Sequence, residues 1–342
     1  MIQIAITHAI AALGVAVFHV LGLPLPWLLG PIIACLIAAL AGVPMRGMPL
    51  VNNLMRTILG VAVGATFTWA LLVTMAGMWT TLILVPLMVF LIGLVGVPYF
   101  QRLWGFDFAT SYYGAMPGGL QDMLLFGEEA GGDVRALSLI HATRVMVIVV
   151  ALPFILQGYW GVDLSNPPGV PATSLPVSQL ILMVVCGVAG WQIAKAFGLF
   201  GASILGPMIL SAILALAGIL QFRPPAEAIW MAQFFIGMTV GTKYAGVTGA
   251  EVRRDVTAAL GFCVILLILS GIFVETIHLL NLAPPMETLL AFAPGGQAEM
   301  TVLALIAGAD MAFVIAHHVL RIVVVILGAP LAARLFRSRP RG

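Results

Sequence analysis

Two pairs of ionisable residues recur at the same spacing in an otherwise apolar sequence. His141 precedes Arg144 by three residues, and His318 precedes Arg321 by three. Residues three apart share one face of a helix, and at 1.5 Å per residue each arginine would lie about 16 Å from the start of its helix. A cation at that depth needs a partner. The pattern therefore predicts either an anionic ligand or a structural ion pair that pins a neighbouring segment.

Two carboxylates occupy a second pair of equivalent positions. Asp122 and Glu299 each stand five residues after a proline, Pro117 and Pro294. A carboxylate at membrane depth is costly and is by default a functional candidate. It could accept a coupling proton or supply oxygens to a sodium ion. The structural alternative is an interfacial carboxylate stabilised by a helix dipole. We predict ion coupling by four residues: Asp122, Glu299, His141 and His318.

Each carboxylate follows a break in the expected helix. The two breaks read MPGGLQDM (116–123) and APGGQAEM (293–300). Proline removes a backbone donor and glycine weakens a helix, while the free amides of a hairpin tip favour anions. A kink or a tight packing point is the alternative. The predicted substrate-binding residues are Pro117, Gly118, Gly119, Gln121, Pro294, Gly295, Gly296, Gln297, Arg144 and Arg321.

The composition restricts the class of protein that can contain these residues. Of 342 residues, 62% are hydrophobic and 8% charged, with mean hydropathy +1.13, whereas soluble domains carry about 25% charged residues. This favours a polytopic membrane protein with room for roughly ten spans. A net charge of +2 and the lack of a soluble basic module argue against nucleic-acid binding. The histidines form no H-x-H or H-x-x-x-H cluster, so we expect no enzyme, no catalytic residue, no metal and no cofactor.

The sequence also contains an internal duplication. Residues 28–42 (LLGPIIACLIAALAG) match 204–218 (ILGPMILSAILALAG), and GVAVGAT at 60–66 matches GMTVGTK at 237–243. The offset is 176 residues before Gly60 and 177 from there on. We therefore predict a first transmembrane repeat at 1–160, a periplasmic linker at 161–176 and a second transmembrane repeat at 177–342.

Each repeat is expected to contain five spans and one interrupted segment. The expected spans are 4–22, 26–43, 54–73, 77–98 and 134–157, then 176–197, 203–220, 228–244, 257–280 and 311–333. The interrupted segments, 108–130 and 287–308, can either cross the membrane or dip in and return. The positions of lysine and arginine favour a return, with both termini cytoplasmic and the linker outside. Five spans per repeat is an odd number, so the repeats have inverted topology.

The paired PGG-x-x-[DE]-M and H-x-x-R motifs resemble the AbrB-type membrane family (membrane AbrB duplication). The resemblance covers essentially the whole chain. Members of this family are labelled ammonia monooxygenases or transcriptional regulators. The PGG hairpins are also similar in architecture to the glycine-rich re-entrant hairpins of glutamate–sodium and citrate carriers, which implies a transporter by analogy.

We therefore predict an all-α polytopic protein of the bacterial inner membrane that carries a small organic anion. The coupling ion would be a proton or sodium, and the site would lie between the two hairpin tips near the midplane. A channel or carrier for a small neutral solute such as ammonia is the alternative, as is an indirect effect on gene expression. The expected partners are the substrate and the lipid bilayer. The oligomeric state is open, although a homodimer is common among carriers with moving units.

Overall fold

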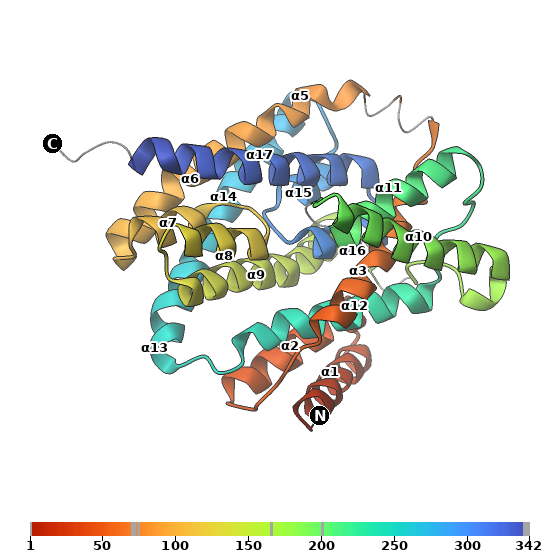
Figure 1. Cartoon of the computed structure of the whole chain (residues 1–342), viewed down its shortest axis with the longest axis horizontal. Helices are drawn as coiled ribbons and strands as arrows, with labels where there is room; N and C mark the ends of the chain where they lie inside the picture. The colour runs from red at the N-terminus through yellow and green to blue at the C-terminus, as the bar shows by residue number, and fades with distance from the viewer. Residues whose placement is uncertain (1, 70–72, 74–75, 165–166, 200–201, 338–342) are drawn as a thin grey trace. The chain divides into compact units, whose positions relative to one another are not determined.

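The computed structural model describes residues 2–69, 73, 76–164, 167–199 and 202–337, and all regular secondary structure in these ranges is helical (Figure 1). The side chains of residues 76, 121, 122, 125, 297, 298 and 330–337 are not described. Among the described residues, six helices are long and apolar enough to cross a membrane. The expected all-α polytopic membrane class is confirmed.

The chain forms two compact units, and each draws segments from both halves of the sequence. The first unit comprises Met1–Gly77, Val149–Gly246 and Ala298–Ala312, and the second comprises Met78–Ile148, Val247–Gln297 and Phe313–Gly342. A duplicated segment need not fold as a separate body, because the apolar face of one copy can be covered by the other. The predicted repeat boundaries describe the sequence, and the compact units cut across them.

The first unit is built from three helices of each repeat. These are α1 (Ile2–Val20), α2 (Pro26–Leu40) and α3 (Pro49–Gly64), then α10 (Val177–Ala196), α11 (Ala202–Leu216) and α12 (Ala226–Gly241), together with α16 (Gln297–Ile306) and the short turns η3 (Ala172–Ser174) and η4 (Thr242–Tyr244). Proline stands in the first turn of α2 and of α3, where its missing N–H costs no hydrogen bond.

Four of these helices are shorter than the sequence suggests. α2 and α11 have 15 residues, and α3 and α12 have 16, which corresponds to about 22–24 Å at 1.5 Å per residue. A bilayer core is about 30 Å thick. The expected span 54–73 is wrong in its bounds, because the helix begins at Pro49 and ends at Gly64. The cause is local: Pro49 starts the helix earlier than hydropathy indicates.

Glycines at equivalent positions pack helices of one repeat against helices of the other. A Cβ on Gly60 of α3 would collide with the carbonyl oxygen of Ile204 in α11, and a Cβ on Gly237 of α12 would collide with that of Leu28 in α2. Leu28 is the equivalent of Ile204, and Gly237 is the equivalent of Gly60. The second contact is therefore the same as the first, with the roles of the two repeats exchanged. One turn later, a Cβ on Gly64 would collide with the carbonyl oxygen of Met208 in α11, and one on Gly241 with that of Ile32 in α2. Each repeat thus uses a G-x-x-x-G pair, Gly60 and Gly64 or Gly237 and Gly241, for close helix packing.

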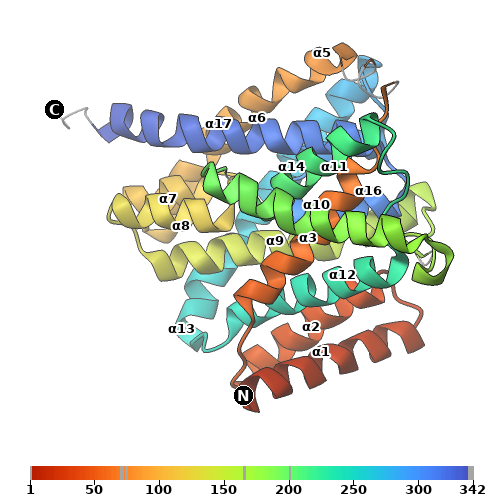
Figure 2. The same cartoon turned by 45° about the vertical axis from the view of Figure 1, so that its right-hand side comes forward.

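Two equivalent helices of the first unit, α3 and α12, run in opposite directions. Both views show α3 and α12 antiparallel to each other (Figures 1 and 2). Reciprocal contacts together with antiparallel equivalent helices are what a two-fold axis across the helices produces. Inverted repeats would have such an arrangement, and the inverted topology of the repeats stays a prediction.

The second unit contains the whole of the first interrupted segment and the part of the second up to Gln297. Its helices are α5 (Trp79–Leu82) after the turn η1 (Ala76–Met78), α6 (Leu84–Pro98), the π-helix η2 (Tyr99–Leu103), α7 (Phe108–Ala115), α8 (Leu120–Glu129), α9 (Val134–Trp160) up to residue 148, α13 (Gly249–Glu251), the π-helix η5 (Val252–Val256), α14 (Thr257–Leu279), α15 (Pro285–Phe292) and α17 (Met311–Arg337) from residue 313. The helix interruptions expected within 108–130 and 287–308 are confirmed as the gaps between α7 and α8 and between α15 and α16.

Candidate functional site

The first PGG break is an extended turn of four residues between two short helices. α7 ends at Ala115, and Met116 and Gly119 both adopt extended backbone conformations before α8 begins at Leu120. A Cβ on Gly118 would lie 2.8 to 2.9 Å from the side chains of Met123 and Val325. The break is therefore packed tightly, and glycine fits where a larger residue would displace its neighbours.

The first interrupted segment returns to the level at which it started. The backbone N–H of Asp133, just before α9, donates to Oγ1 of Thr110 in the first turn of α7 at 2.8 Å. Gly132 lies against the same residue, since a Cβ there would be 3.1 Å from the Thr110 backbone nitrogen. Thr110 and Asp133 bracket the hairpin, so α7 and α8 form an antiparallel pair. This geometry is what a re-entrant hairpin requires.

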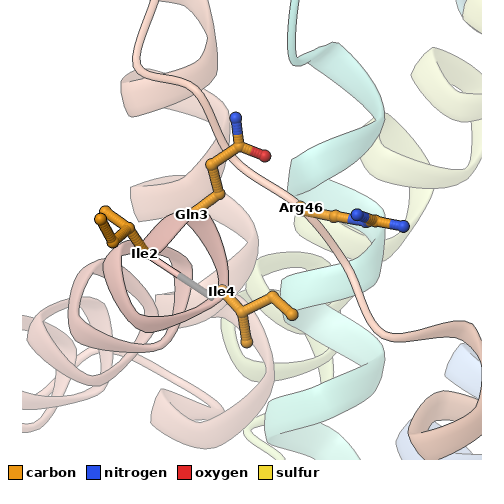
Figure 3. Close-up of a pocket in the computed structure, with 4 residues that line it drawn as sticks. All are labelled: Ile2, Gln3, Ile4 and Arg46. Carbon is orange, nitrogen blue, oxygen red and sulfur yellow. The ribbon is translucent and has the colours of Figure 1, made fainter.

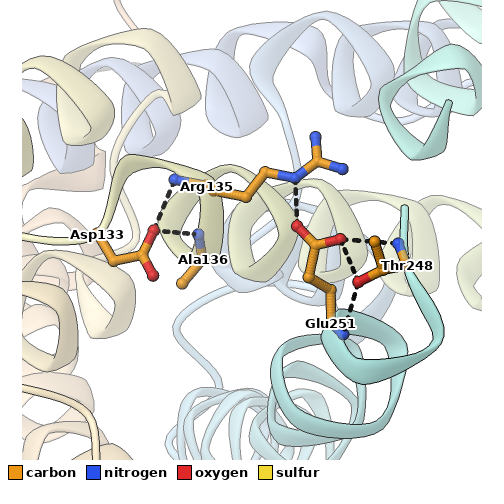
Figure 4. Close-up of polar contacts among 5 residues, drawn as sticks. All are labelled: Asp133, Arg135, Ala136, Thr248 and Glu251. Atoms are coloured by element: carbon orange, nitrogen blue, oxygen red, sulfur yellow. Dashed lines mark hydrogen bonds and ion pairs between the residues drawn. The ribbon is translucent and has the colours of Figure 1, made fainter. Parts of the chain in front are cut away.

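Aspartates cap the two helices that carry the His-x-x-Arg motifs. Asp133 Oδ1 accepts hydrogen bonds from the backbone N–H groups of Arg135 and Ala136, at 2.9 and 3.0 Å (Figure 4). Asp310 Oδ1 accepts one from Ala312 at 2.9 Å. Both aspartates therefore act as N-caps of these helices.

Arg144 holds the first break together. Its two terminal nitrogens donate to the carbonyl oxygens of Met116, at 2.9 Å, and of Gly118, at 3.0 Å. The side chain is only 2% exposed. Because Pro117 and the break interrupt the helical ladder, these carbonyls have no helical donor, and the guanidinium replaces it.

Arg321 makes the same two bonds at the second break. It donates to the carbonyl oxygens of Ala293, at 2.8 Å, and of Gly295, at 3.0 Å. Each partner lies 177 residues after its counterpart in the first break. The duplication therefore extends from the sequence to individual hydrogen bonds. We call Arg144, Arg321 and the four carbonyls the paired arginine clamps.

The two histidines bind the helices that lead into the breaks. His141 Nε2 donates to the carbonyl oxygen of Tyr113 at 3.1 Å, and His318 Nε2 donates to that of Leu290 at 2.9 Å. A carbonyl only accepts, so Nε2 carries the proton in both rings. Both histidines are buried. They hold α7 and α15 parallel to the start of α9 and α17.

The clamps leave polar atoms without partners. Among the described residues, buried Nε atoms of Arg144 and Arg321 and Nδ1 atoms of His141 and His318 make no hydrogen bond. The two guanidinium groups also lie close enough to repel each other electrostatically. No carboxylate contacts either arginine among the described side chains. A buried pair of like charges with spare donors favours an anion.

The sequence predicts a carboxylate or an anion as the partner of each arginine, and it does not indicate the carbonyls. Every residue carries a carbonyl, so no residue type marks these acceptors. The one available signal is the break itself, because a broken helix exposes acceptors that a deep cation can satisfy.

The remaining predicted site residues divide into two groups. Glu299 belongs to the first compact unit, where it is buried and interacts electrostatically with Arg56. The side chains of Gln121, Asp122 and Gln297 lie outside the described residues. The backbone places Gln121 and Asp122 in the first turn of α8, and Gln297 at the start of α16.

A shallow open depression of about 430 Å³ lies elsewhere, in the first unit. It is lined by Ile2, Gln3, Ile4 and Arg46 (Figure 3). Arg46 is anchored there through its backbone N–H, which donates to Thr7 Oγ1 at 3.1 Å. The depression contains none of the predicted site residues and offers one cation at an open surface.

A surface ion pair joins the start of α9 to α13. Arg135 Nε donates to Glu251 Oε1 at 2.6 Å (Figure 4), and their side chains are 44% and 23% exposed. The other oxygen of Glu251 accepts from the backbone N–H and the hydroxyl of Thr248, both at 2.7 Å, in a capping box.

Replacing the two partners of this ion pair should have unequal effects. Arg135→Ala is expected to lower the free energy of unfolding by less than about 1 kcal/mol, because the pair is exposed. Glu251→Ala should cost more, about 1–2 kcal/mol, since it also removes the cap of α13. Thermal unfolding of both variants in detergent measures the order. An Arg135→Ala variant that is the less stable of the two would contradict it.

The geometry defines a class: an internally duplicated polytopic membrane protein in which each of two helix breaks is held by a buried arginine. The chain belongs to the AbrB family, since the family profile described as "Transition state regulatory protein AbrB" matches residues 27–337. It is 28% identical to "Uncharacterized protein YhjN" of Bacillus subtilis, covering 96% of this chain and 91% of that protein. It is 24% identical to "Putative regulator AbrB" of Escherichia coli, covering 94% and 92%. No solved structure matches this chain.

Proposed function

We propose that this protein is a secondary active transporter that binds a small organic anion at the paired arginine clamps. The observation that carries the proposal is the unpartnered Nε–H of Arg144 and of Arg321, both buried, in a pair of like charges. An anion bound there would receive both donors and offset the repulsion between the two guanidinium groups.

The backbone of the breaks supports the same proposal. Gly119 precedes α8 and Gly296 precedes α16, so each break presents a helix N-terminus with free amide groups, which favour negative charge. Irregular backbone at membrane depth is tolerated only where protein or a water-filled cavity surrounds it. Two such breaks in one compact unit are what a substrate site at a repeat interface needs.

Transport would require motion between two bodies, with a proton or sodium ion as the coupling ion. The two compact units are the natural candidates for those bodies. We place the protein in the bacterial inner membrane with both termini in the cytoplasm, on the basis of its arginine and lysine distribution. We assign no catalytic residue to it. The regulator name of the Escherichia coli relative is compatible with uptake of a signal metabolite.

Ligand-induced thermal stabilisation tests the proposal. Purified protein is heated with acetate, succinate, citrate or ethanesulfonate, each with and without sodium. A ligand at 100 times its dissociation constant stabilises the native state by about 2.7 kcal/mol, so at least one anion should raise the melting temperature by several degrees. Methylammonium serves as a cationic control that should have no effect.

Flux measurements separate a carrier from a pore. In proteoliposomes, uptake of the stabilising anion should saturate and should respond to an imposed proton or sodium gradient. Large unsaturable flux would favour a channel instead. Uptake that ignores both gradients for every anion tested would count against an ion-coupled transporter.

A further inference from the structure

His317 is a buried ionisable residue next to the second clamp that the proposed substrate site does not use. It is 0% exposed. Its Nδ1 lies 2.7 Å from the carbonyl oxygen of Phe313, and its Nε2 lies 3.0 Å from Oγ1 of Thr81 in α5. The rings of Phe313 and Phe292 lie 4.1 and 5.4 Å from the imidazole, centroid to centroid.

The hydrogen bonds around His317 allow two protonation states. A carbonyl only accepts, so Nδ1 carries a proton in either state. The hydroxyl of Thr81 lies within reach of two acceptors, because its Oγ1 is also 2.9 Å from the carbonyl oxygen of Met78. If the hydroxyl donates to Nε2, the imidazole is neutral. If it rotates to donate to Met78, Nε2 must carry a proton that it donates to Oγ1.

The switch between these states needs no heavy atom to move. Only the hydroxyl hydrogen of Thr81 changes direction, and every donor and acceptor of His317 is satisfied before and after. The hydrogen-bond partners of an ordinary buried histidine match only the neutral imidazole, because burying an unpaired charge is costly. The flanking phenylalanine rings also tolerate an imidazolium, because aromatic faces attract cations.

The equivalent position in the first repeat is apolar. At the offset of 177 residues, His317 corresponds to Ile140 and Thr81 corresponds to Ala258, and both of these residues are buried. The polar pair is therefore not part of the shared framework, whereas the clamps are. A single proton site requires such an asymmetry, since a duplicated one would bind two protons.

The ionisable neighbours of His317 link its charge to the second clamp. On α17, Arg321 stands four residues later on the same helix face, and His318 is adjacent. α5 carries no ionisable residue; α15 carries Glu287, and α14 carries Cys263, Glu275 and His278. In the described part of the chain, no hydrogen bond or ion pair joins any of these four residues to His317. Protonation of His317 would thus add a third positive charge near the clamps.

We propose that His317, with Thr81 as its rotating partner, binds the coupling proton and that this proton and the anion stabilise each other's binding. This rests on the proposed anion site. An anion at Arg321 would offset the repulsion between Arg321 and a protonated His317. By linkage, protonation then raises anion affinity by the same factor. The protein would act as a proton–anion symporter, with affinity for the anion highest at low pH.

The first experiment measures protonation directly and does not depend on an anion. The full-length protein in lipid nanodiscs, with ¹⁵N-labelled histidine, is titrated by NMR between about pH 4 and pH 9. The His317 signal is assigned from the double variant Thr81→Ala and His317→Ile, which copies the apolar pair of the first repeat and should fold. We expect the Nε2 signal of His317 to change from that of an acceptor nitrogen to that of an N–H.

The second experiment measures coupling. Thermal stabilisation by succinate or ethanesulfonate is compared at several pH values in the wild type and the double variant. The wild type should bind the anion about 5- to 150-fold more tightly when His317 is protonated. The double variant should bind the anion with the affinity of the neutral state and without this pH dependence. Thr81→Val removes the hydroxyl and keeps the imidazole of His317. This variant should also lose the pH dependence of anion affinity.

The outcomes distinguish this inference from the proposed function. A His317 that stays neutral across the range would overturn the inference and leave the anion site untouched. An unchanged pH dependence in the double variant would overturn the coupling. If His317 titrates and no anion binds, the proton site is supported while the proposed anion transport fails.

Discussion

Arg144→Ala and Arg321→Ala should each abolish anion-induced stabilisation and also destabilise the free protein. Each substitution removes one of the two spare Nε–H donors and leaves two buried carbonyl oxygens without donors. Each buried acceptor left unsatisfied costs about 1–3 kcal/mol. The melting temperature without ligand reports the second effect, and its shift with succinate or ethanesulfonate reports the first.

Two further variants separate charge from geometry. Arg144→Lys keeps the positive charge, but an ammonium is a compact point charge that cannot reproduce the planar fork across both carbonyls. The lysine variant should bind an anion weakly, and it should be little more stable than Arg144→Ala. Arg135→Ala removes a cation from the same helix outside the clamps and should respond to the anion as the wild type does. If both alanine variants at the clamps still bind the anion normally, the arginines are structural and the anion site is wrong.

Gly60→Ala and Gly237→Ala should each lower the free energy of unfolding by about 1–3 kcal/mol, because added volume at a tight contact forces backbone shifts. At both positions the new methyl group would collide with a carbonyl oxygen of a neighbouring helix. The two effects should be similar in size, since the contacts are exchanged copies of one another. Unfolding in detergent by heat or a denaturing detergent measures them.

Gly271→Ala is the matched control for these variants. Gly271 lies within α14, and a Cβ there would meet nothing within 4 Å. Alanine favours a helix over glycine by up to about 1 kcal/mol, so this variant should be neutral or more stable. If Gly60→Ala proves as stable as Gly271→Ala, the close approach of α3 to α11 does not exist in the native protein.

Local features of the fold follow from short stretches of sequence. The positions of the two breaks are encoded by PGG, because proline lacks a donor and glycine disfavours helix wherever they stand. Asp133 and Asp310 could be recognised as N-caps for a similar reason, since a cap bonds to backbone within a few residues. Helix bounds were less predictable: hydropathy did not indicate that α3 ends at Gly64.

The partners of the buried polar residues could not be predicted in this way. The clamps join residues 26 and 28 positions apart, and His317 meets Thr81 across 236 positions. Carbonyl acceptors carry no signature in the residue type, and a threonine in an apolar helix usually bonds to its own backbone. Only the packing of α5 against α17 turns Thr81 into a partner of His317.

The class, the duplication, the breaks and the family follow from the amino-acid sequence, because composition, repetition and local backbone chemistry are read without knowing which segments meet. Three-dimensional packing is needed to show that the arginines clamp carbonyls, that the glycines pack one repeat against the other and that each compact unit mixes both repeats. These facts depend on which surfaces bury one another. Such pairing is a property of the whole chain, since the apolar faces of the two repeats are similar and only packing selects among them.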